Sequence, residues 1–119
     1  MDEPMSLRAI NLQPALESME NDQEILDAVA EAFIGEVPKL LQQLETALAE
    51  GDVSAAERAA HTLKGNFRIL RLAEQQICWA EIEKRLQQRG SIDNHLANAT
   101  RITQSTLEGL REYLQGSTS

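Results

Sequence analysis

His61 is the residue of this 119-residue chain whose surroundings are best suited to chemistry. It lies in the run Ala55–Leu70, whose 3.6-residue periodicity is typical of one amphipathic helix. The imidazole falls on the side of that helix opposite the apolar residues, so we expect it to face solvent. An exposed imidazole is mostly neutral near pH 7, and one of its ring nitrogens is then free to act as a nucleophile. The apolar face of this helix is predicted to contain Ala56, Ala59, Ala60, Leu63, Phe67 and Leu70.

Three further residues share the predicted exposed face with His61: Lys64, Gly65 and Arg68. The two cations could stabilise a negatively charged phosphoryl group on the imidazole, or attract an acidic partner surface. A glycine inside a helix costs about 1 kcal/mol relative to alanine, so Gly65 needs a reason. The absence of a side chain would let the active site of another protein approach closely, as in-line phosphoryl transfer requires.

A less specific interpretation treats the same residues as an ordinary solvated helix face. A metal site built from His61 and His95 has no recognisable ligand spacing, so we predict no metal. We expect His95 to lie on the surface, Trp79 to lie in the core, and Cys78 to be an inert, partly buried thiol. The remaining carboxylates of this region are predicted to be solvated surface rather than an acid/base pair; they include Glu81, Glu83 and Asp93.

The helix that carries His61 is one of several that the sequence predicts. Asp22 and Asp52 are expected N-caps, and Gly51 and Gly90 are expected stops. Pro38, preceded by Gly35, is expected to kink one helix or to open a new one. Apolar stripes are predicted at Ile25, Ala28, Val29, Ala32 and Phe33, at Val37, Leu40, Leu41, Leu44 and Leu48, at Ile77, Trp79, Ala80, Ile82 and Leu86, and at Leu96, Ala99, Leu107, Leu110 and Leu114. The predicted helices are about 12–19, 22–35, 37–50, 52–70, 72–89 and 91–115.

Short connections force successive helices to run antiparallel. The prediction is therefore a single all-α domain over residues 1–119, an antiparallel up-down four-helix bundle with a short extra N-terminal helix across one end. Aromatic residues make up only 3% of the chain, so the core must be built mainly from aliphatic side chains.

The formal net charge of −8 argues against binding to nucleic acid or to an anionic membrane. The N-terminus lacks a signal-peptide pattern and no 18-residue apolar run occurs, so a cytoplasmic location is expected. The single cysteine cannot form an intramolecular disulfide. No Gly-rich phosphate loop is present, and we expect a monomer without its own ATP site.

The segment Ala60-His61-Thr62-Leu63-Lys64-Gly65 resembles the His-x-Leu-Lys-Gly signature of histidine-containing phosphotransfer (HPt) domains. The similarity extends over roughly Ile25 to Leu86, and includes the run Phe33–Leu41. This resemblance implies that His61 accepts a phosphoryl group from a receiver-domain aspartate of a hybrid histidine kinase. The group would then pass to an aspartate of a response regulator. It also implies that the chain is a carrier rather than an enzyme and needs no cofactor, with Mg²⁺ held by the receiver.

By the same resemblance, Lys64 would help to hold the phosphoryl group, and Gly65 would give the partner access. The chain departs from the family pattern at Asn66 and Phe67, where small residues are usual, and at Arg71, where glycine is common. Arg68 and Arg71 are expected to affect which partner is accepted. Two alternatives stay open: a helical module that binds a receiver without being phosphorylated, and the phosphorylatable domain of a chemotaxis-type kinase.

Overall fold

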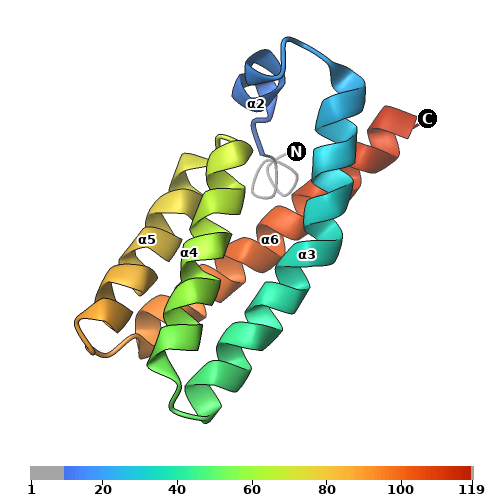
Figure 1. Cartoon of the computed structure of the whole chain (residues 1–119). Coiled ribbons are helices and arrows are strands. Elements are labelled where there is room, and N and C mark those ends of the chain that lie inside the picture. Colours follow the sequence, from blue (N-terminus) through green and yellow to red (C-terminus); the bar gives the residue numbers. More distant parts are fainter. Residues whose placement is uncertain (1–9, 119) are drawn as a thin grey trace, which may run out of the picture.

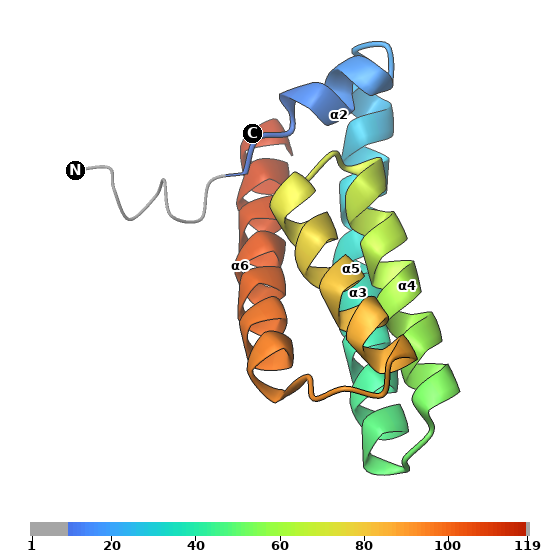
Figure 2. The same cartoon turned by 90° about the vertical axis from the view of Figure 1, so that its left-hand side faces the viewer.

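A computed structural model describes residues 10–118, and all regular structure in that range is helical. Four long helices pack in the cyclic order α3, α4, α5, α6, and the short helix α2 packs against one end of α3 (Figures 1 and 2). The predicted antiparallel four-helix bundle with a short N-terminal helix is confirmed. The helices are α2 (Gln13–Ser18), α3 (Gln23–Ala49), α4 (Val53–Ile69), α5 (Ala73–Gln87) and α6 (Asp93–Thr118).

Aspartate side chains cap the first turns of two helices. The Asp22 carboxylate accepts hydrogen bonds from the backbone N–H groups of Glu24 and Ile25, at 3.1 and 3.2 Å. Asp52 accepts one from the N–H of Ala55 at 3.1 Å. Each bond satisfies a donor that the helix itself leaves without a partner, and such a cap typically contributes about 1 kcal/mol. The two predicted N-caps are therefore confirmed.

Residues with left-handed backbone follow three of the long helices. Gly51 has φ +74° after α3, as its predicted role as a stop requires. Arg71 (φ 57°) and Arg89 (φ 56°) take the same conformation after α4 and α5. The residue that turns the chain after α5 is therefore Arg89 rather than the predicted Gly90, and α6 begins at Asp93 rather than at Ser91.

The predicted break at Gly35 and Pro38 does not occur, because α3 runs unbroken through both residues. Proline inside a helix removes one backbone hydrogen bond and costs about 3 kcal/mol. Here the ring of Pro38 lies on the exposed side of the helix. The continuous buried stripe on both sides of it outweighs the local cost; its members are Leu26, Ala30, Phe33, Val37, Leu40, Leu41, Leu44 and Ala47.

This stripe also corrects the predicted core face in the first half of α3. Ile25 is 48% exposed, and Ala28 and Ala32 face solvent as well. Of the five predicted positions only Phe33 is buried, and Val29 is half-buried. The sequence carries two overlapping apolar stripes here, and the face that continues into Val37 and Leu40 is the one that packs.

Trp79 and Phe67 are the largest fully buried side chains of the core. The indole N–H of Trp79 donates a hydrogen bond of 2.9 Å to the hydroxyl of Thr103, which joins α5 to α6. Ile77 is 67% exposed, so its predicted place on the core face of α5 is wrong. Within residues 10–118, no helix combines the length and the apolar character needed to cross a bilayer.

Candidate functional site

His61 lies near the middle of α4, and 65% of its side chain is exposed. The opposite side of α4 is buried in the core, where α4 packs against α3 and α5, and this fixes the direction in which the imidazole points. The predicted outward orientation of His61 is therefore confirmed. The buried side consists of Ala56, Ala59, Ala60, Leu63 and Phe67.

Glu83 of α5 lies beside the imidazole and orients it. Its carboxylate oxygen Oε2 is 2.9 Å from Nδ1 of His61. A carboxylate can only accept, so Nδ1 must carry the proton of this hydrogen bond. In the neutral ring Nε2 then has no proton and keeps its lone pair. The contact therefore selects one tautomer and leaves a defined nucleophilic atom on the exposed ring.

Lys64 binds the other oxygen of the same carboxylate, with Nζ 2.8 Å from Oε1 of Glu83. Only 12% of the Glu83 side chain is exposed, and this burial by itself would raise its pKa. The hydrogen bonds from Lys64 and then from His61, together with their charges, outweigh burial, so the pKa of Glu83 lies below its ordinary value. Glu83 is therefore ionised near neutral pH, and its carboxylate binds both side chains at once.

The prediction that Glu83 is simply solvated surface is wrong. The sequence does contain a signal for its position, because Glu83 lies eleven residues after Leu72 and His61 lies eleven residues before it. In an antiparallel pair of helices joined by a tight turn, residues at equal distances from the turn lie level with each other.

The other two carboxylates lie on the surface, as the sequence predicted. Asp93 is exposed, and Glu81 pairs with Arg85 at 2.8 Å on a partly exposed part of α5.

Gly65 follows His61 by one helical turn, on the same side of α4. A Cβ built on Gly65 would meet no atom within 4 Å, so no neighbouring element packs against it. The glycine therefore does not serve close helix packing. It leaves an open space next to His61.

Arg68 does not join the cluster formed by His61, Lys64 and Glu83. It lies two turns beyond His61, where the end of α4 approaches the end of α2, and it is exposed. There it lines a shallow hollow of about 420 Å³, which we call the α2 notch; the residues of the α2 notch are Ser18, Met19, Arg68, Ile69 and Arg71.

Asn66 and Phe67 contribute to packing rather than to the exposed surface around His61. Phe67 is fully buried, as its place on the apolar face predicted. The side-chain nitrogen of Asn66 is buried and has no hydrogen-bond partner. A buried donor of this kind typically costs about 1–3 kcal/mol.

Cys78 is half-buried, and its thiol donates a hydrogen bond to the backbone oxygen of Gln75 at 3.2 Å. Burial, with the nearby charge of Glu74, raises the pKa of Cys78 to about 11. The residue therefore stays a protonated, weakly reactive thiol near neutral pH. His95 is exposed on α6, as expected. Over residues 10–118, no three His, Cys, Asp or Glu side chains lie close enough together to hold a metal ion.

Comparison with known proteins agrees with this arrangement. The family model described as Hpt domain matches residues 28–116, which is three quarters of the chain and includes the whole cluster around His61. Neither a curated protein nor a solved structure matches the sequence. Hpt domains are phosphocarrier modules rather than kinases, and they act with receiver domains in two-component systems. The chain belongs to the Hpt domain family.

Proposed function

We propose that this protein carries a phosphoryl group on Nε2 of His61 between two receiver domains of a phosphorelay. The observation that carries the proposal is the hydrogen bond from Nδ1 to Glu83, which leaves Nε2 unprotonated on an exposed ring. The open space at Gly65 supports it, since a partner's active site must come within bonding distance of that nitrogen.

In the first transfer, the lone pair of Nε2 attacks the phosphorus of an aspartyl phosphate on the upstream receiver. The N–P bond forms as the P–O bond to the aspartate breaks, and the aspartate leaves as a carboxylate. The proton on Nδ1 stays in place, so the phosphorylated ring carries a positive charge that faces the Glu83 carboxylate. The second transfer is the reverse reaction, with an aspartate of the response regulator as the nucleophile.

Lys64 acts on this reaction in two ways. Its ion pair holds Glu83 in position, and its ammonium group adds positive charge one turn from the ring that receives the phosphoryl group. The protein itself contributes no metal ion in this scheme, and the divalent ion is expected to arrive bound to the receiver. The contribution of this protein to catalysis is then to position the His61 ring and to stabilise the charge of the phosphoryl group.

The test is incubation with phosphorylated receiver domains of the source organism. The wild-type chain should acquire an acid-labile phosphoryl group, and ³¹P–¹H NMR should locate it on Nε2. His61→Gln should acquire none, whereas His95→Gln should be labelled like the wild type because His95 lies on another helix. Receiver binding without any label on the wild type would instead support a module that is not phosphorylated.

A further inference from the structure

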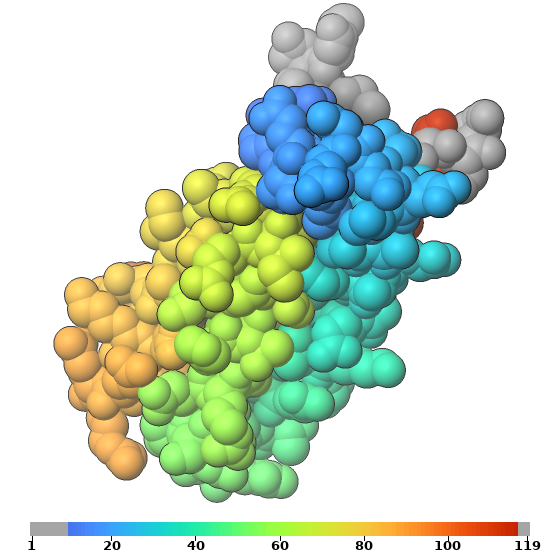
Figure 3. Space-filling view, turned by 45° about the horizontal axis from the view of Figure 1, so that its top comes forward, coloured from blue at the N-terminus to red at the C-terminus, as the bar shows by residue number. Residues whose placement is uncertain are grey.

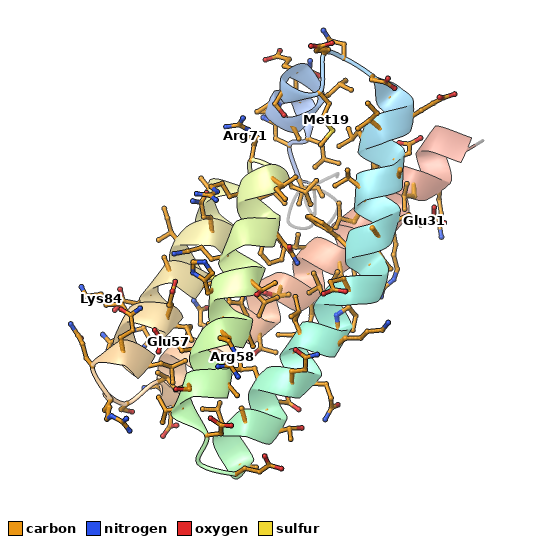
Figure 4. The ribbon with its side chains drawn as sticks, in the orientation of Figure 1. Met19, Glu31, Glu57, Arg58, Arg71 and Lys84 are labelled. Atoms are coloured by element: carbon orange, nitrogen blue, oxygen red, sulfur yellow. The ribbon has the colours of Figure 1, made fainter. Side chains whose placement is uncertain are left out.

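Helix α5 contributes Glu83 to the site, and the rotation of α5 about its own axis decides whether that contact exists. Glu83 faces α4, whereas the next residue, Lys84, is exposed and points to the outer side of α5 (Figure 4). A side chain that ends about 5–6 Å from the helix axis moves by about 2 Å when the helix turns by about 20°. A shift of that size would break the 2.9 Å hydrogen bond between Glu83 and His61.

Burial of apolar side chains does not by itself account for this rotation of α5. The side chain of Gln75 is only 8% exposed, while that of Ile77, two residues later, is 67% exposed. Two residues turn a helix by about 200°, so these two side chains lie on nearly opposite sides of α5. The hydrophobic effect favours the reverse arrangement, with the isoleucine inside and the amide in water. Other contacts must therefore hold α5 in its observed rotation.

Buried hydrogen bonds to α6 supply these contacts. The indole N–H of Trp79 donates to the hydroxyl of Thr103 at 2.9 Å. The side-chain amide of Gln75 donates to the hydroxyl of Thr106, also at 2.9 Å, and that hydroxyl donates to the backbone oxygen of Ile102 at 2.8 Å. Both threonines are buried. A buried polar group that loses its partner destabilises the fold, so each of these bonds resists a rotation of α5.

The contacts of α5 with α4 and with α6 lie on adjacent turns of the helix. Trp79 precedes Glu83 by four residues, or about one turn, and the two side chains leave α5 about 40° apart. Helix α5 lies between α4 and α6 (Figure 2), and Figure 3 shows it against α4 on one face of the molecule. Trp79 thus fixes α5 to α6, and the neighbouring side of the same helix presents Glu83 to His61.

We propose that two buried threonines of α6, Thr103 and Thr106, are positioning residues for His61. Their bonds to α5 hold that helix in the rotation that places the Glu83 carboxylate at Nδ1 of the imidazole. Both are buried on a different helix from His61, so they act through Glu83. Their effect on phosphoryl transfer rests on the proposed function, whereas their effect on the ring is measurable in the unphosphorylated protein.

The first test compares two substitutions of Thr103. Thr103→Val keeps the shape of the side chain and removes the hydroxyl that accepts from Trp79, whereas Thr103→Ser keeps the hydroxyl and removes a methyl group. In Thr103→Val, the ¹⁵N shifts of the His61 ring should lose the signature of a single Nδ1–H tautomer, and transfer from a phosphorylated receiver should fall about three- to tenfold. Thr103→Ser should keep the wild-type ring shifts and transfer rate. His95, the second of the two histidines, is the internal reference.

The second test removes a whole hydrogen bond and leaves no polar group unpaired. Gln75→Leu combined with Thr106→Val replaces both partners by apolar side chains of similar size, a change that can leave stability unchanged or raise it. This double variant should stay folded by circular dichroism and show altered His61 ring shifts like those of Thr103→Val. It tests the proposal even where Thr103→Val does not fold.

A double-mutant cycle shows whether the threonines act through Glu83. In a Glu83→Ala background, Thr103→Val should leave transfer unchanged, because the contact that the threonine positions is already gone. A further loss of transfer in that background would overturn the proposal, as would equal losses in Thr103→Ser and Thr103→Val.

Wild-type ring shifts in both Thr103→Val and the Gln75→Leu/Thr106→Val variant would also overturn the positioning proposal. Failure of the wild type to acquire any label from a phosphorylated receiver would instead refute the carrier function. The ring shifts of the unphosphorylated variants would then still decide whether the threonines position His61.

Discussion

Nδ1 of His61 and Oε2 of Glu83 lie 2.9 Å apart, although 22 residues separate them in the sequence. The contact joins α4 to α5 at the point where the His61 side chain extends from α4 into solvent. It gives the ring a fixed orientation that exposure on a single helix would not provide.

Glu83→Ala should therefore slow transfer from a phosphorylated receiver by about tenfold or more, because a charge-assisted hydrogen bond typically contributes about 1.5–3 kcal/mol. The ¹⁵N chemical shifts of the His61 ring should also lose the signature of a single Nδ1–H tautomer. Glu81→Ala is the control, since Glu81 pairs with Arg85 and has no contact with His61. Transfer at the wild-type rate in Glu83→Ala would contradict a positioning role.

The lowered pKa of Glu83 predicts a pH-dependent contribution to stability. A carboxylate with a lower pKa in the folded state stabilises the fold above its unfolded pKa, near 4.5, and that contribution is lost as the pH falls further. The free energy of unfolding of the wild type should thus exceed that of Glu83→Gln at pH 7, and the gap should shrink below pH 4.5. Urea denaturation at pH 7, 5, 4 and 3 measures it. A gap that stays constant down to pH 3 would disprove the linkage.

Gly65→Gln should keep the fold, because no atom lies where its side chain begins, and should increase helix stability by up to about 1 kcal/mol. Its side chain would occupy the space next to His61, so transfer from a receiver should fall at least tenfold. Gly35→Gln is the matched control, since Gly35 lies inside α3 and also has open space around it. It should stabilise the protein similarly and leave transfer unchanged. Equal transfer rates in the two variants would refute the access argument.

Arg71→Gly should raise the free energy of unfolding by about 0.5–1 kcal/mol, measured by thermal or urea denaturation. Arg71 has φ 57°, a conformation that costs a residue with a Cβ about 1–2 kcal/mol, and the greater freedom of glycine in the unfolded chain offsets part of the gain. Arg89→Gly, at φ 56°, should give a similar gain. Arg68→Gly should destabilise the protein, because Arg68 is helical, and a gain there would contradict the explanation.

Arg71→Gly should at the same time reduce receiver binding, because it removes an exposed cation beside the end of α4 that is expected to affect which partner is accepted. At a position where the resemblance to Hpt domains led us to expect glycine, this chain has an arginine with left-handed backbone. Improved stability together with weaker docking in one variant would show that the strain is retained for the interaction. Isothermal titration of the wild type and of Arg71→Gly with the same receiver measures the second effect.

The sequence was sufficient to predict the helices, the bundle and the face of α4 that holds His61, because these follow from local periodicity and from capping residues such as Asp22 and Asp52. It did not predict Glu83 at the site, since that contact depends on how α4 and α5 align. The unbroken helix through Pro38 was missed for a related reason: the local cost of proline is visible in the sequence, and the burial that outweighs it is not. Arg71 and Arg89 have the left-handed backbone that usually favours glycine, and an arginine gives no signal of this conformation in the sequence.

The bond to Glu83 also bears on how long a phosphoryl group would last on His61. The carboxylate is held at Nδ1, across the ring from the nitrogen that would carry the phosphorus, and its second oxygen is occupied by Lys64. It is thus kept away from any water molecule lined up to attack the phosphorus. An exposed phosphohistidine arranged in this way would hydrolyse slowly. The protein would then keep its phosphoryl group until a partner accepts it, rather than lose the group to water after a set time.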